Sequence, residues 1–150
     1  MTSYISDQLR QQVALRANFL CEYCLLHEDE SYLGCEVDHI ISLKHGGPTE
    51  LWYLGFACMR CNRRKGTDIS SINWQTGSLV RFFNPRRDQW AGHFQLSAAH
   101  ILPLTEIGEV TVRIFGFNEP KRIQERELLW RAGIYPSAAA MEVIGKLGDT

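Results

Sequence analysis

The stretches CEYC at residues 21–24, VDHII at 37–41 and CMRCNRRK at 58–65 decide how the first part of this chain is organised. A C-x2-C pair places two thiolates on one tight turn, close enough to hold one face of a tetrahedral metal ion. Two pairs close the tetrahedron, and we therefore predict a structural zinc site with the ligands Cys21, Cys24, Cys58 and Cys61. A redox-active iron–sulfur cluster is the alternative for the same four thiolates.

Length and composition place the chain among ordinary globular proteins. It has 150 residues, of which 45% are hydrophobic, enough for one domain with a core of its own. It has no apolar run of the roughly 18 residues that a membrane span needs, and its first residues lack the pattern of a signal peptide. Five cysteines, four of them in metal-type pairs, favour reduced thiols over a disulfide framework. We therefore expect a cytoplasmic protein that does not enter membranes.

Charge is unevenly distributed along the chain, although the formal net charge is −1. Residues 1–59 carry three basic and eight acidic side chains, whereas residues 60–90 carry seven basic and two acidic ones. A concentrated basic segment is typical of a phosphate-binding surface, but also of a solvated face without a ligand. Because this one begins beside the second cysteine pair, we predict that it binds nucleic acid through Arg60, Arg63, Arg64, Lys65, Arg81, Arg86 and Arg87.

Periodicity and turn signals predict an α+β fold, with a strand–strand–helix core that the metal clamps at its ends. The elements expected for this core are a helix at 6–18 capped by Ser6 or Asp7, a strand at 36–41, a returning strand at 51–57 and a helix at 59–65. Between the two strands, the sequence HGGP at 45–48 is a strong turn signal.

The remainder of the chain is expected to be an α+β extension at 69–135 and a weakly specified tail at 136–150, within a single domain over residues 1–150. Its expected elements are strands at 78–83, 93–96 and 109–115 and a helix that begins at Asn118 and ends near Gly133. The strand at 109–115 is the most convincing of these, because branched residues alternate along it.

Residues 18–68 resemble the HNH endonuclease family. The cysteine pairs, the string VDHII, the double glycine at 46–47 and the string CNRRK occur in the order that the family has. The resemblance implies a ββα-metal fold that cleaves nucleic-acid phosphodiester bonds, with His39 as the general base toward water. It also implies that Asp38 and Asn62 hold a catalytic Mg²⁺ or Mn²⁺ ion, which stabilises the departing oxygen.

Two features of this motif make demands on the structure. The family has an asparagine, thought to brace the loop that carries the base, five residues before the third cysteine, where this chain has Tyr53. A tyrosine hydroxyl cannot replace the donor and the acceptor of an amide together. In addition, neighbours on a regular strand point to opposite faces. Asp38 and His39 can therefore share one site only if the strand is distorted or ends at residues 38–40.

The function that we predict is metal-dependent hydrolysis of DNA, with RNA as an alternative substrate. The competing hypothesis is a catalytically weakened zinc module that binds nucleic acid or a protein partner. A homodimer would make paired cuts easier. Three remaining residues are expected only to pack, namely Cys35 and, in preference to stacking on bases, Trp74 and Trp90.

Overall fold

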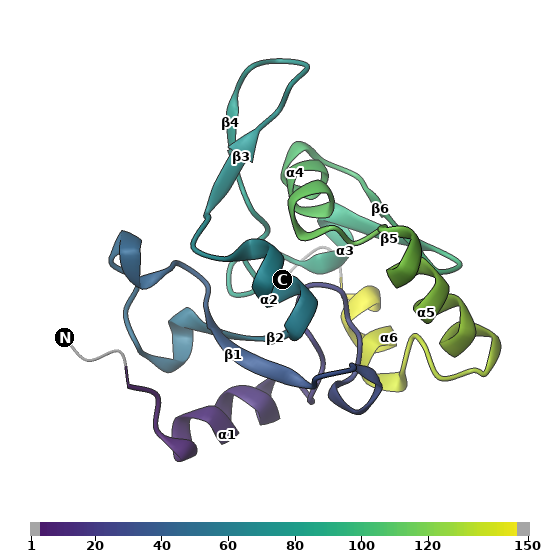
Figure 1. Ribbon diagram of the computed structural model, residues 1–150, viewed down its shortest axis with the longest axis horizontal. Coiled ribbons are helices and arrows are strands. Elements are labelled where there is room, and N and C mark those ends of the chain that lie inside the picture. Colours follow the sequence, from purple (N-terminus) through teal and green to yellow (C-terminus); the bar gives the residue numbers. More distant parts are fainter. Residues whose placement is uncertain (1–3, 147–150) are drawn as a thin grey trace. The chain divides into compact units, whose positions relative to one another are not determined.

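The computed structural model describes residues 4–146, and the chain forms two compact units, Met1–Ile69 and Ser70–Thr150 (Figure 1). The sequence had suggested a single domain. The division falls next to residue 68, where the resemblance to the nuclease family ends. Each unit is built around its own buried side chains.

The first unit is an antiparallel pair of strands packed between two helices. Its elements are α1 (Asp7–Arg16), the 3-10 turns η1 (Glu28–Glu30), η2 (Leu43–His45) and η3 (Leu51–Tyr53), the strands β1 (Cys35–His39) and β2 (Leu54–Cys58), and α2 (Met59–Lys65). This is the strand–strand–helix core that the sequence predicts, preceded by the expected N-terminal helix.

Helix α1 begins at Ser6, whose hydroxyl accepts a hydrogen bond from the amide of Leu9 at 3.1 Å. A hydroxyl at this position replaces the carbonyl that the first turn of a helix lacks for its amide groups. On the inner side of the helix, Val13 and Ala14 are buried against Leu54 and Phe56 of β2. The helix therefore covers one face of the hairpin.

The other face of the hairpin carries polar side chains toward α2. In the register of the two strands, Val37 lies opposite Phe56, and Asp38 lies opposite Gly55. Successive residues of a strand point to opposite faces, so Val37 belongs to the α1 side and Asp38 to the α2 side. Helix α2 ends where Gly66 adopts a positive φ of 55°.

Over its described residues, 70–146, the second unit contains two hairpins and four helices. Its elements are β3 (Ser70–Ile72), β4 (Leu79–Arg81), α3 (Trp90–His93), β5 (Phe94–Ser97), β6 (His100–Pro103), α4 (Glu106–Phe115), α5 (Pro120–Arg131) and α6 (Ala138–Gly145). Strand β3 pairs with β4, and β5 pairs with β6. An aromatic cluster fills the core, with neighbouring ring centroids 5.1–5.8 Å apart, and includes Phe82, Phe83, Trp90, Phe94, Phe115 and Phe117.

The prediction of a strand at 109–115 is wrong, because these residues belong to helix α4. Thr105 caps this helix by accepting a hydrogen bond from the amide of Gly108 at 3.0 Å, and Gly116 ends it with φ 65°. The side chains of Thr111 and Phe115 are buried one helical turn apart. Branched residues that alternate in the sequence thus also satisfy a helix that is buried on one side.

Three smaller expectations for this unit also need correction. Asn118 does not cap α5, because the cap residue is Glu119. The side-chain amide of Asn118 instead donates to the carbonyl of Ile101 at 2.7 Å and accepts from the amide of Ile101 at 3.0 Å. The segment expected to be a weakly specified tail contains α6, and its last four residues lie outside the described part of the chain. Trp90 is packed as expected, whereas Trp74 is 78% exposed on the β3–β4 hairpin.

Candidate active site

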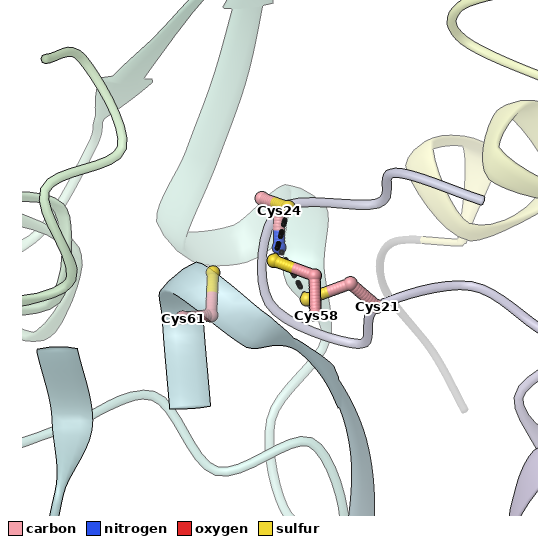
Figure 2. A group of neighbouring side chains, drawn as sticks. All are labelled: Cys21, Cys24, Cys58 and Cys61. Atoms are coloured by element: carbon pink, nitrogen blue, oxygen red, sulfur yellow. Dashed lines mark hydrogen bonds between the residues drawn. The ribbon is translucent and has the colours of Figure 1, made fainter. Parts of the chain in front are cut away.

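Four cysteine side chains, two from the turn at 21–24 and two from the end of β2 and the first turn of α2, meet at one point of the first unit (Figure 2). Their sulfur atoms all lie within 4.8 Å of one another, and the ligand set Cys21, Cys24, Cys58 and Cys61 is buried. The sulfurs of Cys24 and Cys58 are 3.8 Å apart, which matches the edge of a tetrahedron with zinc–sulfur bonds of about 2.3 Å. The predicted cysteine cluster is confirmed, and its size and chemistry fit a structural zinc ion.

Local hydrogen bonds shape the turn that carries the first cysteine pair. The amide of Leu25 donates to the carbonyl of Cys21 at 2.9 Å, while Leu25 itself adopts φ 66°. Glu22 joins this turn to β2, since its amide donates to the carbonyl of Phe56 and its carboxylate accepts from the amide of Phe56. The turn is therefore attached to the hairpin by backbone contacts as well as by the cysteines.

Burial keeps the thiols of the cluster protonated unless a cation is bound. Burial raises the pKa of Cys21 and of Cys61 well above the usual range of a thiol. Thiolates at these positions would be unstable without a positive charge between them, and a zinc ion would supply that charge. Cys35, which pairs with Cys58 across the hairpin, is half-buried and packs against the α1 side as expected.

Asp38 and Lys65 form an ion pair inside the β1–α2 interface. The Lys65 ammonium lies 3.2 and 3.3 Å from the two carboxylate oxygens and donates to the carbonyl of His39 at 2.9 Å. The hydroxyl of Tyr23 donates to the same carboxylate at 3.2 Å. Asp38 is 6% exposed and Lys65 2% exposed. Burial raises the pKa of Asp38, and the opposing effect of Lys65 and Tyr23 is smaller.

A second contact of the same kind lies one turn earlier on α2. The amide nitrogen of Asn62 donates to a carboxylate oxygen of Glu36 at 2.9 Å. Glu36 is two residues before Asp38, so both carboxylates project from one face of β1. Carboxylate and amide oxygens are the ligands that Mg²⁺ and Mn²⁺ prefer. The donor chemistry of this face fits such a cation, which would have to share Asp38 with Lys65 and Tyr23.

His39 is the last residue of β1. The strand pairs regularly with β2 up to His39, which lies opposite Leu54, and it ends there. Within residues 38–40 the strand therefore ends and is not distorted. The Nε2 atom of His39 lies 2.9 Å from the hydroxyl of Thr49. Burial, and to a smaller extent the charge of Lys65, lowers the pKa of His39. The lowered pKa favours the neutral form of the imidazole.

Tyr53 contacts the end of β1 through its backbone rather than its side chain. Its carbonyl accepts a hydrogen bond at 3.1 Å from the amide of Ile40, the residue after His39. Arg16 at the end of α1 donates to the carbonyls of Leu51 and Leu54, on the two sides of Tyr53. Neither Arg16 nor Thr49 was expected near the site, because no local motif relates them to His39.

The seven basic residues expected to bind nucleic acid fall into two sets. Arg60, Arg63, Arg64 and Lys65 lie on α2 in the first unit, whereas Arg81, Arg86 and Arg87 belong to the second unit. Arg63 and Arg64 are exposed. Lys65 differs from the expectation, because its ammonium is buried against Asp38 and not presented to a ligand at the surface. Arg81 forms a two-pronged ion pair with Asp88 at 2.8 and 2.9 Å.

Comparison with known proteins addresses the first unit alone. No curated protein and no solved structure matches the chain. Among the described residues, no helix has the length and apolar character needed to cross a membrane. Residues 21–68 match the family model of HNH endonucleases, and this segment includes both cysteine pairs, Asp38, His39 and Asn62. The match covers about a third of the chain and lies wholly within the first unit.

Proposed function

We propose that this protein is an endonuclease that hydrolyses DNA phosphodiester bonds with the help of a divalent cation. The observation that carries the proposal is the position of His39 within the HNH segment, at the open end of a strand. Its ring is held by Thr49, and its low pKa keeps it neutral. The oxygen donors of Asp38 and Asn62 lie on the adjoining β1–α2 interface.

In this proposal His39 is the general base. A neutral imidazole can accept a proton from a water molecule while that water attacks the phosphorus atom. Asp38 and Asn62 would hold Mg²⁺ or Mn²⁺, which supplies positive charge for the phosphate and the departing oxygen. Lys65 keeps the carboxylate of Asp38 ionised and in place, and its bond to the His39 carbonyl fixes the end of β1.

The arginines of α2 would hold the phosphates of the substrate. Arg63 and Arg64 are exposed on the helix that also carries Asn62. Each phosphate contact of this type releases counterions, so binding should weaken steeply as salt concentration rises. Arg87, exposed in the second unit, is a further candidate.

The test is cleavage of supercoiled plasmid by the zinc-loaded protein in Mg²⁺ or Mn²⁺, with His39→Ala and His45→Ala beside the wild type. His45 lies in η2 and is exposed, so it serves as the matched control. We expect His39→Ala to cut at least 100-fold more slowly, which is the loss typical of a missing general base. Equal cutting by His39→Ala and wild type would refute the assignment. A labelled RNA of the same sequence decides between the two substrates.

A zinc module that binds nucleic acid or a protein without cutting is the second candidate. The observation that favours it is the Asp38 carboxylate, which Lys65 and Tyr23 already engage. In that case DNA would be retarded in a gel but remain intact with every divalent cation. We further propose a cytoplasmic location, where thiols stay reduced. A homodimer, which sedimentation would detect, is proposed for paired cuts.

A further inference from the structure

We propose that Arg16 of α1 is the residue that positions His39, in place of the asparagine that the HNH pattern has at Tyr53. The positioning acts through residues 49–53, which include η3 and which we call the η3 segment. This inference rests on the proposed function for its catalytic meaning. Its structural content, that Arg16 holds the segment which holds His39, can be tested separately.

The first step is the contact between Arg16 and the two ends of η3. One guanidinium nitrogen donates to the carbonyl of Leu51 at 2.7 Å, and the other donates to the carbonyl of Leu54. These carbonyls lie on either side of Tyr53. A guanidinium is planar and presents two parallel donors, so it can fix the distance between two acceptors, which a single ammonium donor cannot. Helix α1 is itself anchored by Val13 and Ala14 in the core.

The second step leads from η3 to the backbone beside the base. The carbonyl of Tyr53 accepts a hydrogen bond from the amide of Ile40 at 3.1 Å. Ile40 follows His39 directly, and β1 has already ended at this point. The three carbonyls of Leu51, Tyr53 and Leu54 are thus used in turn by Arg16, Ile40 and Arg16 again. The position of Ile40, and with it the end of β1, depends on how firmly η3 is held.

The third step concerns the imidazole ring. The hydroxyl of Thr49 lies 2.9 Å from Nε2 of His39. Thr49 is the first residue of the η3 segment, and the amide of Tyr53 donates to the carbonyl of Glu50 within it. A threonine hydroxyl can accept a hydrogen bond from the Nε2 group of a neutral imidazole, which leaves the other ring nitrogen as the base. The segment therefore contacts His39 at its ring and at the following amide.

An asparagine side chain could contact both the ring of His39 and the backbone beside it. Here the Thr49 hydroxyl contacts the ring, and the backbone carbonyl of Tyr53 accepts from the amide of Ile40. Neither requires an asparagine at Tyr53, whose side chain is 37% exposed. The residue that secures both comes from α1, which lies outside the 21–68 segment matched by the family. Helix α1 is then part of the catalytic unit and not only a cover for the hairpin.

The experiment compares Arg16→Ala with Arg10→Ala in the full zinc-loaded chain. Arg10 is exposed on the same helix and serves as the matched control. Hydrogen exchange of the Ile40 amide, followed by NMR, reports the brace directly. We expect Arg16→Ala to accelerate this exchange about tenfold or more, while the amides that pair β1 with β2 change less than about twofold. Arg10→Ala should change neither.

Cleavage under single-turnover conditions reports the catalytic consequence. At saturating DNA, Arg16→Ala should be slowed about tenfold or more, with DNA affinity altered less than about threefold, since a misplaced base costs rate and not binding. Arg16→Lys, which keeps the charge but not the paired donors, should recover only part of the rate. Thr49→Val should slow cleavage, whereas Thr49→Ser should restore it.

An unchanged Ile40 exchange rate in Arg16→Ala would overturn the proposal, whatever the nuclease activity. If Arg16→Ala does not fold, as judged by circular dichroism and zinc content, Arg16→Gln takes its place with the same decision. If Arg16→Ala accelerates Ile40 exchange but the wild-type protein cuts no DNA, the contact of Arg16 with the η3 segment is supported and the proposed function is refuted. An unchanged cleavage rate despite faster exchange would refute the catalytic part of the inference.

Discussion

Replacement of Lys65 by methionine should destabilise the first unit strongly, because it leaves the Asp38 carboxylate buried without its cation. The ammonium contacts both carboxylate oxygens at 3.2–3.3 Å and the His39 carbonyl at 2.9 Å, and both partners are more than nine-tenths buried. Removal of one partner of such a pair typically costs about 3–5 kcal/mol. Because Tyr23 still donates to Asp38, we expect about 3 kcal/mol in urea unfolding of the zinc-loaded protein at pH 8.

The pH dependence of this loss has a definite sign. Burial already raises the pKa of Asp38, and without Lys65 that pKa rises further. Between the unfolded and the folded pKa the native state then binds more protons, so stability increases as pH falls. The deficit of Lys65→Met should therefore shrink as the pH is lowered from 8. The double variant Asp38→Asn/Lys65→Met should recover at least about 1.5 kcal/mol. A cost below about 1 kcal/mol, or simple additivity of the two changes, would refute this reasoning.

Four further outcomes are expected from the structure. Cys61→Ser should lower the zinc content and unfold the first unit. Elemental analysis of the wild type should find one zinc per chain in a colourless protein, and bound iron would contradict the zinc assignment. Burial lowers the pKa of His93, so the second unit should lose stability as pH falls through about 6.5, and His93→Gln should flatten this decline in urea titrations. Thr105→Val should cost about 1 kcal/mol or more in urea unfolding, because it removes the cap of α4 and the 2.6 Å contact between the hydroxyl and Nδ1 of His93. Arg63→Ala should weaken DNA binding similarly for all sequences and reduce its salt dependence; a sequence-dependent loss would contradict a phosphate contact.

The cysteine cluster and the hairpin could be predicted because their signals are local. Ligand spacing within one turn, the branched residues around Asp38 and the glycine after Lys65 each act over a few positions. Helix α4 could not be predicted, since Val110, Val112 and Ile114 alternate with the period of a strand. The residues that are buried along it, Gly108, Val110, Thr111 and Phe115, follow the period of a helix. Its true signals, the hydroxyl of Thr105 and the glycine at 116, lie outside the alternating stretch.

The contacts of Arg16 and Thr49 near His39 could not be predicted from the sequence for a different reason. Arg16 and Leu51 are 35 residues apart, and they meet only because α1 packs on β2. Nothing in the residues around Arg16 marks it as a partner of a carbonyl. The Lys65–Asp38 pair was missed in the same way, since a lysine at the end of a basic run has the sequence character of a surface residue.

The zinc site and the Arg16 contacts act on opposite ends of the same hairpin. A zinc ion on the four cysteines would hold Cys58, which pairs with Cys35 at the start of β1, whereas His39 lies at the other end, opposite Leu54. Four strand positions separate Cys35 from His39, a distance of about 13 Å at the usual rise per residue. A metal fixed at one end cannot set a side chain at the other to the accuracy that proton transfer needs. We therefore expect the cysteines to stabilise the hairpin, while the proposed contacts of Thr49, Tyr53 and Arg16 orient His39.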